Sequence, residues 1–170
     1  RDRVILSKGH GAAGLYAVMY HNGLLDKSFI DTYFKDNTIL AGHASHHVPC
    51  VEHSTGGLGH GFPVGLGVAI GMRSKKINSR VYVILGDAEM QEGSNWEAIM
   101  LAGHLKMSNL IALIDINELG QVGKLEDCCT LEPLAQKFES FNFNVYDVDG
   151  HDEVQINNAV NKSKNSTKPT

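Results

Sequence analysis

The sequence contains few cysteines, prolines and tryptophans: three, four and one, respectively, among 170 residues. Cys128 and Cys129 are adjacent and Cys50 is distant, and such an odd set is a poor disulfide framework. We therefore expect a reduced, cytoplasmic protein. The sequence also lacks an apolar run long enough to cross a bilayer and an opening signal segment, so we expect no membrane association.

Positive charge is scarce as well. The 15 Lys and Arg residues are outnumbered by 19 Asp and Glu residues, which gives a net charge of −4. The basic residues are scattered along the chain, and this argues against nucleic-acid binding. The length suits one domain with a core of its own. Because the chain opens at Arg1 and closes at Lys168-Pro169-Thr170, we expect a single domain over residues 1–170, truncated at both ends of a longer polypeptide.

Three short segments predict buried strands: residues 80–85, 110–115 and 144–148. Near-continuous aliphatic runs without polar alternation are typical of parallel strands that are covered on both faces. Helices are predicted between and before them, over residues 11–21, 65–72, 94–106, 131–141 and 152–162. The alternation of strands and helices predicts an α/β fold, a doubly wound and mostly parallel sheet with helices on both faces.

Two polar residues follow successive predicted strands. Asp87 comes directly after residues 80–85, and Asn117 follows residues 110–115. Ligands of such sheets bind at the carboxyl ends of the strands. Either residue alone would be read as an ordinary turn residue. Together they predict a site of hard oxygen ligands, which suits Mg²⁺ completed by phosphate and water oxygens.

Several motifs then resemble one known family. Gly86-Asp87-Ala88, followed by Asp115-Ile116-Asn117, resembles the Gly-Asp-Gly to Asn-Asn motif of thiamine-diphosphate enzymes. Four further segments resemble transketolases in particular, in order along the whole chain: Leu6-Ser7-Lys8-Gly9-His10-Gly11, Gly42-His43, Ser54-Thr55-Gly56-Gly57-Leu58-Gly59-His60-Gly61 and Glu92-Gly93-Ser94-Asn95-Trp96-Glu97-Ala98. The chain is therefore similar to the diphosphate-binding, N-terminal domain or subunit of a transketolase.

The resemblance implies a role for individual residues. Asp87, Asn117 and the backbone carbonyl of Leu119 would hold the divalent cation, Mg²⁺ or Ca²⁺. Thiamine diphosphate would be bound by a set that also includes Asn117 and comprises His10, Gly56, Gly57, Leu58, Gly86 and Ala88. His10 and His43 would be the catalytic histidines, His10 at the cofactor and His43 facing the substrate.

The implied activity is transfer of a two-carbon ketol unit from a ketose phosphate donor to an aldose acceptor. The glutamate that activates the cofactor belongs, in this family, to a pyrimidine-binding domain that the sequence does not contain. The resemblance therefore implies a pyrimidine-binding partner domain or C-terminal subunit, in a homodimer or a heterotetramer, with sugar phosphates as substrates. Alternatives are a non-catalytic module with the same fold, a deoxyxylulose-phosphate synthase and a component of a 2-oxo acid dehydrogenase.

Three positions depart from the family pattern. Ala88 replaces the third glycine of the motif, and its methyl group would cost about 1 kcal/mol or more if φ had to be positive. Ala44 stands where proline usually follows His43, and His60 replaces a common glutamine. These departures concern the sugar substrates more than the cofactor.

Several other side chains are expected to have structural roles. His46, His47 and His53 are expected on a surface loop, because no zinc-ligand spacing accompanies them. Trp96 is expected to pack in the core or an interface. Glu92 and Glu97 either favour the helix N-terminus or lie, as the resemblance implies, between paired subunits. No strand precedes Gly56-Gly57-Leu58-Gly59, which disfavours a dinucleotide site.

Overall fold

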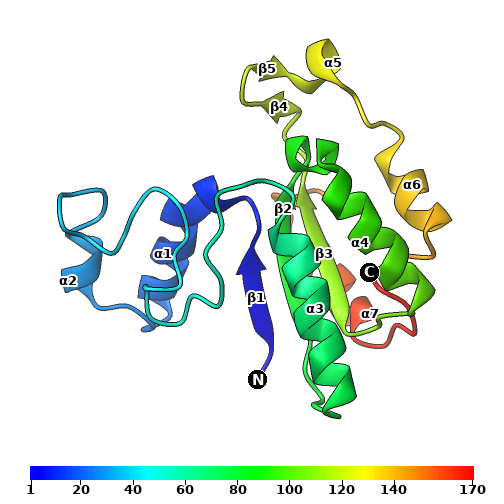
Figure 1. Ribbon diagram of the computed structural model, residues 1–170, viewed down its shortest axis with the longest axis horizontal. Helices are drawn as coiled ribbons and strands as arrows, with labels where there is room; N and C mark the ends of the chain where they lie inside the picture. Colours follow the sequence, from blue (N-terminus) through cyan, green and yellow to red (C-terminus); the bar gives the residue numbers. More distant parts are fainter.

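A three-stranded parallel sheet forms the centre of the molecule. The structure is a computed structural model that describes residues 1–170 (Figure 1). The strands are β1 (Arg3–Leu6), β2 (Val81–Gly86) and β3 (Leu110–Asp115), in the order β1-β2-β3. Leu6 lies opposite Ile84, and Gly86 lies opposite Asp115. All three strands therefore end at one edge of the sheet, the upper edge in Figure 1.

Helices alternate with the strands, which confirms the α/β fold class. They are α1 (Ala12–His21), α2 (Lys27–Ile30), α3 (Gly61–Ser74), α4 (Gly93–His104), α5 (Leu125–Cys128), α6 (Leu134–Ser140) and α7 (Glu153–Ser163), with 3₁₀ turns η1 (Gly9–Gly11) and η2 (Ala88–Gln91). A short hairpin of β4 (Leu119–Gly120) and β5 (Gly123–Lys124) follows β3. No helix combines the length and the apolar character that a membrane crossing requires.

Helix α3 is longer than the 65–72 segment predicted from the sequence. It begins four residues earlier, at Gly61, and Pro63 sits in its first turn, where the missing N–H would have no intrahelical partner anyway. The helix contacts all three strands and α4. Gly65 permits this close approach, because a Cβ there would lie 2.5 Å from the Cγ2 atom of Val83.

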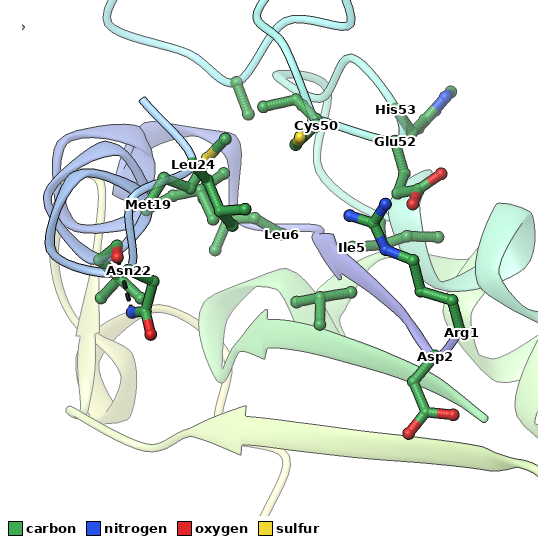
Figure 2. A pocket seen from close by; sticks show the side chains of 15 residues that line it. Arg1, Asp2, Ile5, Leu6, Met19, Asn22, Leu24, Cys50, Glu52 and His53 are labelled. Atoms are coloured by element: carbon green, nitrogen blue, oxygen red, sulfur yellow. Dashed lines mark hydrogen bonds between the residues drawn. The ribbon is translucent and has the colours of Figure 1, made fainter. Parts of the chain in front are cut away.

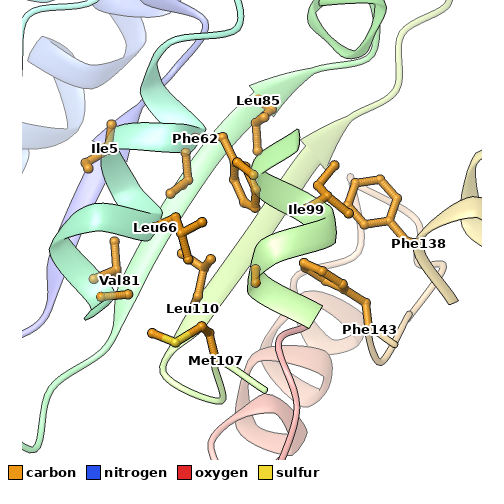
Figure 3. Packing of buried hydrophobic residues seen from close by; sticks show 14 of the residues in the cluster. Ile5, Phe62, Leu66, Val81, Leu85, Ile99, Met107, Leu110, Phe138 and Phe143 are labelled. Carbon is orange, nitrogen blue, oxygen red and sulfur yellow. The ribbon is translucent and has the colours of Figure 1, made fainter. Parts of the chain in front are cut away.

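Two separate apolar clusters stabilise the fold. The larger one lies between α3, α4 and the sheet; Figure 3 shows Phe62 and Leu66 of α3 directed at Leu110 of β3 and its neighbours. The smaller one surrounds α1 and contains Tyr16 and Leu40. Strand β1 joins them, because Ile5 belongs to the larger cluster and Leu6 to the smaller one. Consecutive side chains of a strand point to opposite faces, so each serves a different cluster.

The strand predicted over residues 144–148 is wrong, since this segment has no regular secondary structure. Its burial was predicted correctly in part, because Val145 packs against the larger apolar cluster, which also contains Phe143 just before the segment. The segment does not pair with a strand of the sheet. The backbone of Thr170, not this segment, bonds to β3 at Leu110 and Ala112, and the Asn144 N–H donates to the Pro169 carbonyl rather than to a strand. Conversely, β1 was absent from the predicted strands, because its four residues form too short an apolar run to stand out.

Candidate functional site

The predicted site residues gather at the carboxyl edge of the sheet. Strand β1 leads into Ser7-Lys8-Gly9, β2 ends at Gly86, and β3 ends at Asp115. The glycine-rich segment before α3 lies against the first of these, because a Cβ on Gly9 would be 2.6 Å from the carbonyl oxygen of Thr55. Four stretches of chain that are distant in sequence thus meet at one edge.

Asp87 accepts hydrogen bonds from several residues at this edge. Its side chain is buried, with 6% of the residue exposed. Oδ1 accepts a hydrogen bond from the Ala88 N–H at 2.7 Å, and Oδ2 accepts from the N–H groups of Asn117 at 3.0 Å and Glu118 at 2.6 Å. This confirms the prediction that Asp87 and Asn117 lie side by side. A carboxylate offers about four acceptor positions, so one remains for a cation.

A sharp turn after β3 makes this arrangement possible. Glu118 has φ of 61°, in the left-handed region that non-glycine residues rarely adopt. The turn directs the N–H groups of Asn117 and Glu118 to the same oxygen of Asp87. Within the turn, Asn117 Oδ1 accepts from the Leu119 N–H at 2.9 Å. Asp87, Asn117 and Leu119 are thus brought into one small region.

The glycine-to-alanine departure at position 88 carries no backbone strain. Ala88 opens η2 and is not among the residues with positive φ. Its N–H is bonded to Asp87, and the N–H of Gly86 lies 3.3 Å from Oε2 of Glu89. A Cβ on Gly86 would meet only the flexible Lys8 side chain, at 3.7 Å. Lys8 is therefore the side chain that lies against Gly86.

The glycine-rich loop, residues 56–58, is anchored by hydrogen bonds at both ends. At one end, buried Thr55 donates from Oγ1 to the Leu6 carbonyl at 2.6 Å and from its N–H to the Ala44 carbonyl at 3.0 Å. At the other end, buried Gly59 has φ of 79° and donates its N–H to Glu89 Oε1 at 3.0 Å. Gly56 and Gly57 between them are exposed. The loop presents bare backbone to solvent, which is what close approach of a phosphate ligand requires.

The two predicted catalytic histidines are exposed and stand close to this loop. His10 lies in η1, directly after the segment that packs on Thr55. The ring of His43 lies beside Gly56, since a Cβ there would be 3.6 Å from His43 Cδ2. Tyr16 holds the His43 backbone, donating its hydroxyl to the carbonyl oxygen at 3.1 Å. Burial raises the pKa of the Tyr16 hydroxyl, which is protonated at neutral pH even without this shift.

Sequence reasoning missed Lys8 and Glu89. The Lys8 ammonium pairs with the Asp115 carboxylate, and the chain of Lys8 passes Gly86. Its position inside the Ser-Lys-Gly-His segment was the available signal. Glu89 is only 1% exposed, and its carboxylate contacts Ser7, Gly59 and Gly86. No sequence signal marked it, because its partners become neighbours only on folding.

The charge balance of this edge is negative. Asp87, Glu89 and Asp115 contribute carboxylates, and Lys8 is the cation among the residues that touch them. No group of three or more His, Cys, Asp or Glu side chains is placed to hold a metal ion anywhere in the chain. An anionic ligand here would be repelled unless a cation accompanied it. The single free acceptor position of Asp87, with amide and carbonyl oxygens nearby, fits a cation that shares the phosphate oxygens of its ligand.

A well-defined cavity lies elsewhere in the molecule. It has a volume of about 470 Å³ and is lined mainly by apolar side chains of β1 and α1, such as Leu6, Leu15 and Met19, with Cys50, Glu52 and His53 at its rim (Figure 2). None of the predicted site residues lines it. It is therefore separate from the strand-end site.

The remaining residues considered in the sequence lie as follows. Trp96 packs against Phe138 and Phe141, which confirms its packing role. Glu92 and Glu97 are exposed at the start of α4. His46 and His47 are exposed, and His46 Nδ1 lies 2.6 Å from Ser54 Oγ. All three cysteines are free and exposed.

The parallel sheet carries three features at its strand ends: a buried, hydrogen-bonded aspartate, an adjacent asparagine and an exposed glycine-rich loop. Together they are typical of an α/β domain that binds a phosphate-bearing ligand. Comparison with known proteins is consistent with this class. The family described as the thiamine diphosphate binding domain of transketolase matches residues 1–170. The chain therefore belongs to the transketolase thiamine diphosphate-binding domain family.

Individual relatives agree. The chain is 38% identical over 170 residues to one subunit of the apulose-4-phosphate transketolase of Actinobacillus succinogenes, covering 99% of the chain and 62% of that protein. It is 36% identical to the 6-deoxy-6-sulfo-D-fructose transketolase subunit SqwG of a Clostridium species, covering 96% of the chain and 60% of that protein. It spans about 60% of the length of both relatives.

Solved structures show the same fold. Transketolase from Campylobacter jejuni superposes with a TM-score of 0.95 at 32% identity, covering 99% of this chain and 28% of that one. Transketolase from Leishmania mexicana gives a TM-score of 0.90 at 30% identity, again with 99% of this chain covered and 27% of that one. The match over nearly the whole chain confirms the resemblance inferred from the motifs.

Proposed function

We propose that this chain is the diphosphate-binding half of a cytoplasmic transketolase that transfers a two-carbon ketol unit from a ketose phosphate to an aldose acceptor. The observation that carries the proposal is the convergence of the matched motifs around buried Asp87. We also propose that residues 1–170 form one domain of a longer protein. Its relatives exceed the length of this chain substantially, which supports that view.

In this proposal Asp87 holds a divalent cation, Mg²⁺ or Ca²⁺, together with Asn117 and the carbonyl oxygen of Leu119. The donor set fits the ion, because a carboxylate fixed by three N–H bonds is preorganised and has one acceptor position left. The cation neutralises the repulsion between the diphosphate and the carboxylates at this edge. The Lys8 ammonium adds a second positive charge beside Gly86.

The loops would bind the rest of the cofactor. Gly86 and Ala88 would lie along the diphosphate and contact it through their small size. Their N–H groups are not free to bind it, because each already donates to a carboxylate. Gly56, Gly57 and Leu58 supply the backbone of the anchored loop. Thiamine diphosphate supplies, when bound, an acidic ring carbon that performs the cleavage and formation of carbon–carbon bonds.

His43 would act on the substrate, and His10 would act at the cofactor. His43 stands beside Gly56 with its backbone fixed by Tyr16, so its ring can face a sugar bound over the loop. His10 follows the segment packed on the same loop. The His43 imidazole can donate a hydrogen bond to a sugar hydroxyl or exchange a proton with it, and the His10 imidazole can do the same at the cofactor. His60 differs, because its Nδ1 lies 2.9 Å from the Leu58 carbonyl and serves the loop itself.

A pyrimidine-binding domain or C-terminal subunit would complete the enzyme, as a homodimer or a heterotetramer acting on sugar phosphates. Two similar proteins are named as transketolase subunits, which supports a partner in trans. The surface around the site also suits a partner: Ile116, Leu119 and Val122 expose 53%, 61% and 88% of their areas. Apolar side chains gathered near a site are typical of an interface.

The test mixes the purified chain, thiamine diphosphate and Mg²⁺ with a ketose phosphate and an aldose, with and without the pyrimidine-binding half. We expect transfer only in the complete mixture, because positioned proton transfer to the cofactor is worth about 10²–10⁴-fold in rate. Transfer by the chain alone at the full rate would contradict the division of roles. A chain that binds neither cofactor nor cation in calorimetric titration, even with its partner, would instead be the non-catalytic module.

A further inference from the structure

Glu89 is a buried carboxylate that the proposed chemistry leaves without a role. The residue is 1% exposed and lies on η2, two positions beyond Asp87. A carboxylate removed from water is costly unless hydrogen bonds compensate it. Here they do. Oε1 accepts from the Ser7 hydroxyl at 2.5 Å and from the Gly59 N–H at 3.0 Å, and Oε2 accepts from the Gly86 N–H at 3.3 Å.

The three donors belong to three different parts of the site. Ser7 follows β1, Gly59 closes the glycine-rich loop, and Gly86 ends β2. A fourth element is attached through the backbone, because Asn95 of α4 donates its side-chain amide to the Glu89 carbonyl at 2.8 Å. The Glu89 side chain therefore links the segment after β1, the glycine-rich loop and the end of β2, and its backbone carbonyl adds α4. No other side chain in the chain bonds to more than two of these segments.

Gly59 shows how tightly this junction is packed. Its φ of 79° excludes most side chains, and a Cβ would lie 2.5 Å from Glu92 Cβ. Its carbonyl oxygen accepts from Ser94 Oγ at 2.7 Å, while its N–H is held by Glu89. The last residue of the loop is thus fixed on both sides. Gly56 and Gly57, earlier in the loop, are exposed.

We infer that Glu89 is a positioning residue for the cofactor. Its carboxylate fixes the exit of the glycine-rich loop and the end of β2 relative to each other before the ligand arrives. Affinity then benefits, because a preformed loop loses little conformational entropy on binding. This inference rests on the proposed function for the identity of the ligand, but the fixing of Gly59 and Gly86 is a property of the chain itself.

Two variants separate the contacts. Glu89→Met keeps the length of the side chain and removes all acceptors. Glu89→Gln keeps one oxygen, which would stay with Ser7 and Gly59, and places an amide NH₂ against the Gly86 N–H. Phe138→Leu serves as a control for lost core packing, because Phe138 belongs to the core cluster and its side chain makes no hydrogen bond to these loops. All are made in the full-length protein together with its partner half.

The first readout is the dissociation constant for thiamine diphosphate in saturating Mg²⁺, measured below the melting temperature of each variant. We expect Glu89→Met to weaken binding by about 10–100-fold, as is usual for residues that orient ligand-binding groups, and Glu89→Gln to weaken it less. Phe138→Leu should bind as the parent does. Parental affinity in both Glu89 variants, or an equal loss in Phe138→Leu, would overturn the inference.

The second readout needs no ligand. Hydrogen exchange of the Gly59 amide should accelerate by about tenfold or more in Glu89→Met and stay near the parental rate in Glu89→Gln, since only the former loses that bond. Unchanged exchange at Gly59 in Glu89→Met refutes the role of Glu89. If the parent protein failed to bind thiamine diphosphate while exchange responded as expected, the proposed function would fall and the loop-fixing role would stand. If Glu89→Met does not fold, Glu89→Gln decides through its affinity.

Discussion

Asp87→Asn is the substitution that tests the cation site most directly. Asparagine preserves the shape of the side chain but offers one acceptor oxygen instead of two. We expect that oxygen to face Asn117 and Glu118, where two bonds are kept, and the amide to face the N–H of Ala88, where one is lost. A hydrogen bond to a charged group contributes about 1.5–3 kcal/mol, so unfolding should become easier by about that amount. Asp87→Ala removes all three bonds and is the harsher variant.

The loss of charge affects the cation more strongly than the fold. At about 4 Å and an effective dielectric constant of about 20, a unit charge and a doubly charged ion attract by about 8 kcal/mol. Even a third of this value corresponds to about a 100-fold loss of affinity. The melting temperature, in contrast, should fall by only about 2–4 °C for each kcal/mol in a domain of this size. We therefore expect a folded protein that no longer binds thiamine diphosphate in a Mg²⁺-dependent manner.

The assay is calorimetric titration of thiamine diphosphate with and without Mg²⁺, with thermal melting as the measure of folding. Asp26→Asn is the matched control, because Asp26 is an exposed carboxylate before α2 whose side chain makes no capping bond. It removes the same charge from the chain without affecting the site. If Asp87→Asn bound cofactor with parental affinity and the same dependence on Mg²⁺, our assignment of Asp87 would be wrong.

Three further substitutions test other parts of the structure. His43→Ala should leave cofactor affinity nearly unchanged and lower the transfer rate of the assembled enzyme, whereas His47→Ala should lower it much less; equal rates for parent and His43→Ala would refute the substrate-facing role. Glu118→Gly should be more stable to denaturant than Glu118→Ala by about 1 kcal/mol, because only glycine adopts φ of 61° without strain; the reverse order would show that the turn relaxes. Gly103→Ala should lower the free energy of unfolding by about 1–3 kcal/mol, since its methyl group would overlap a backbone carbonyl of the chain after α6. Gly67→Ala is the control for Gly103, with open space around it and an expected gain of about 0.5–1 kcal/mol; a similar effect of both substitutions would contradict the packing at Gly103.

The sequence predicted the parts of the fold that depend on local pattern. The aliphatic runs of β2 and β3 identified these strands, and their shared direction placed Asp87 next to Asn117. The segment 144–148 has a similar apolar character but no partner strand at β3, because Thr170 occupies that position. An apolar pattern predicts that a segment is buried. Whether the segment pairs as a strand depends on which part of the chain lies beside β3.

The same distinction explains the site. Asp87 could be predicted because a strand end is a local feature. Glu89 could not, since its burial depends on Ser7, Gly59 and Gly86, which are brought together from three segments. Ala88 raised a question of backbone strain that only its dihedral angles could answer, and they are ordinary. Resemblance to a family identified the loops, and the structure supplied the bonds between them.

The two apolar clusters have a consequence for the dynamics of the molecule. Tyr16, in the smaller cluster, holds the His43 backbone, whereas Asp87 follows a strand of the larger cluster. Cooperative units with separate cores can open independently, each with its own free energy. Opening of the α1 unit would displace His43, the residue that we propose to face the sugar, while the proposed cation site stayed intact. Amides of α1 should then exchange faster than those of β2. Under the proposed function, a protein in that state would retain the cofactor but would not bind the sugar.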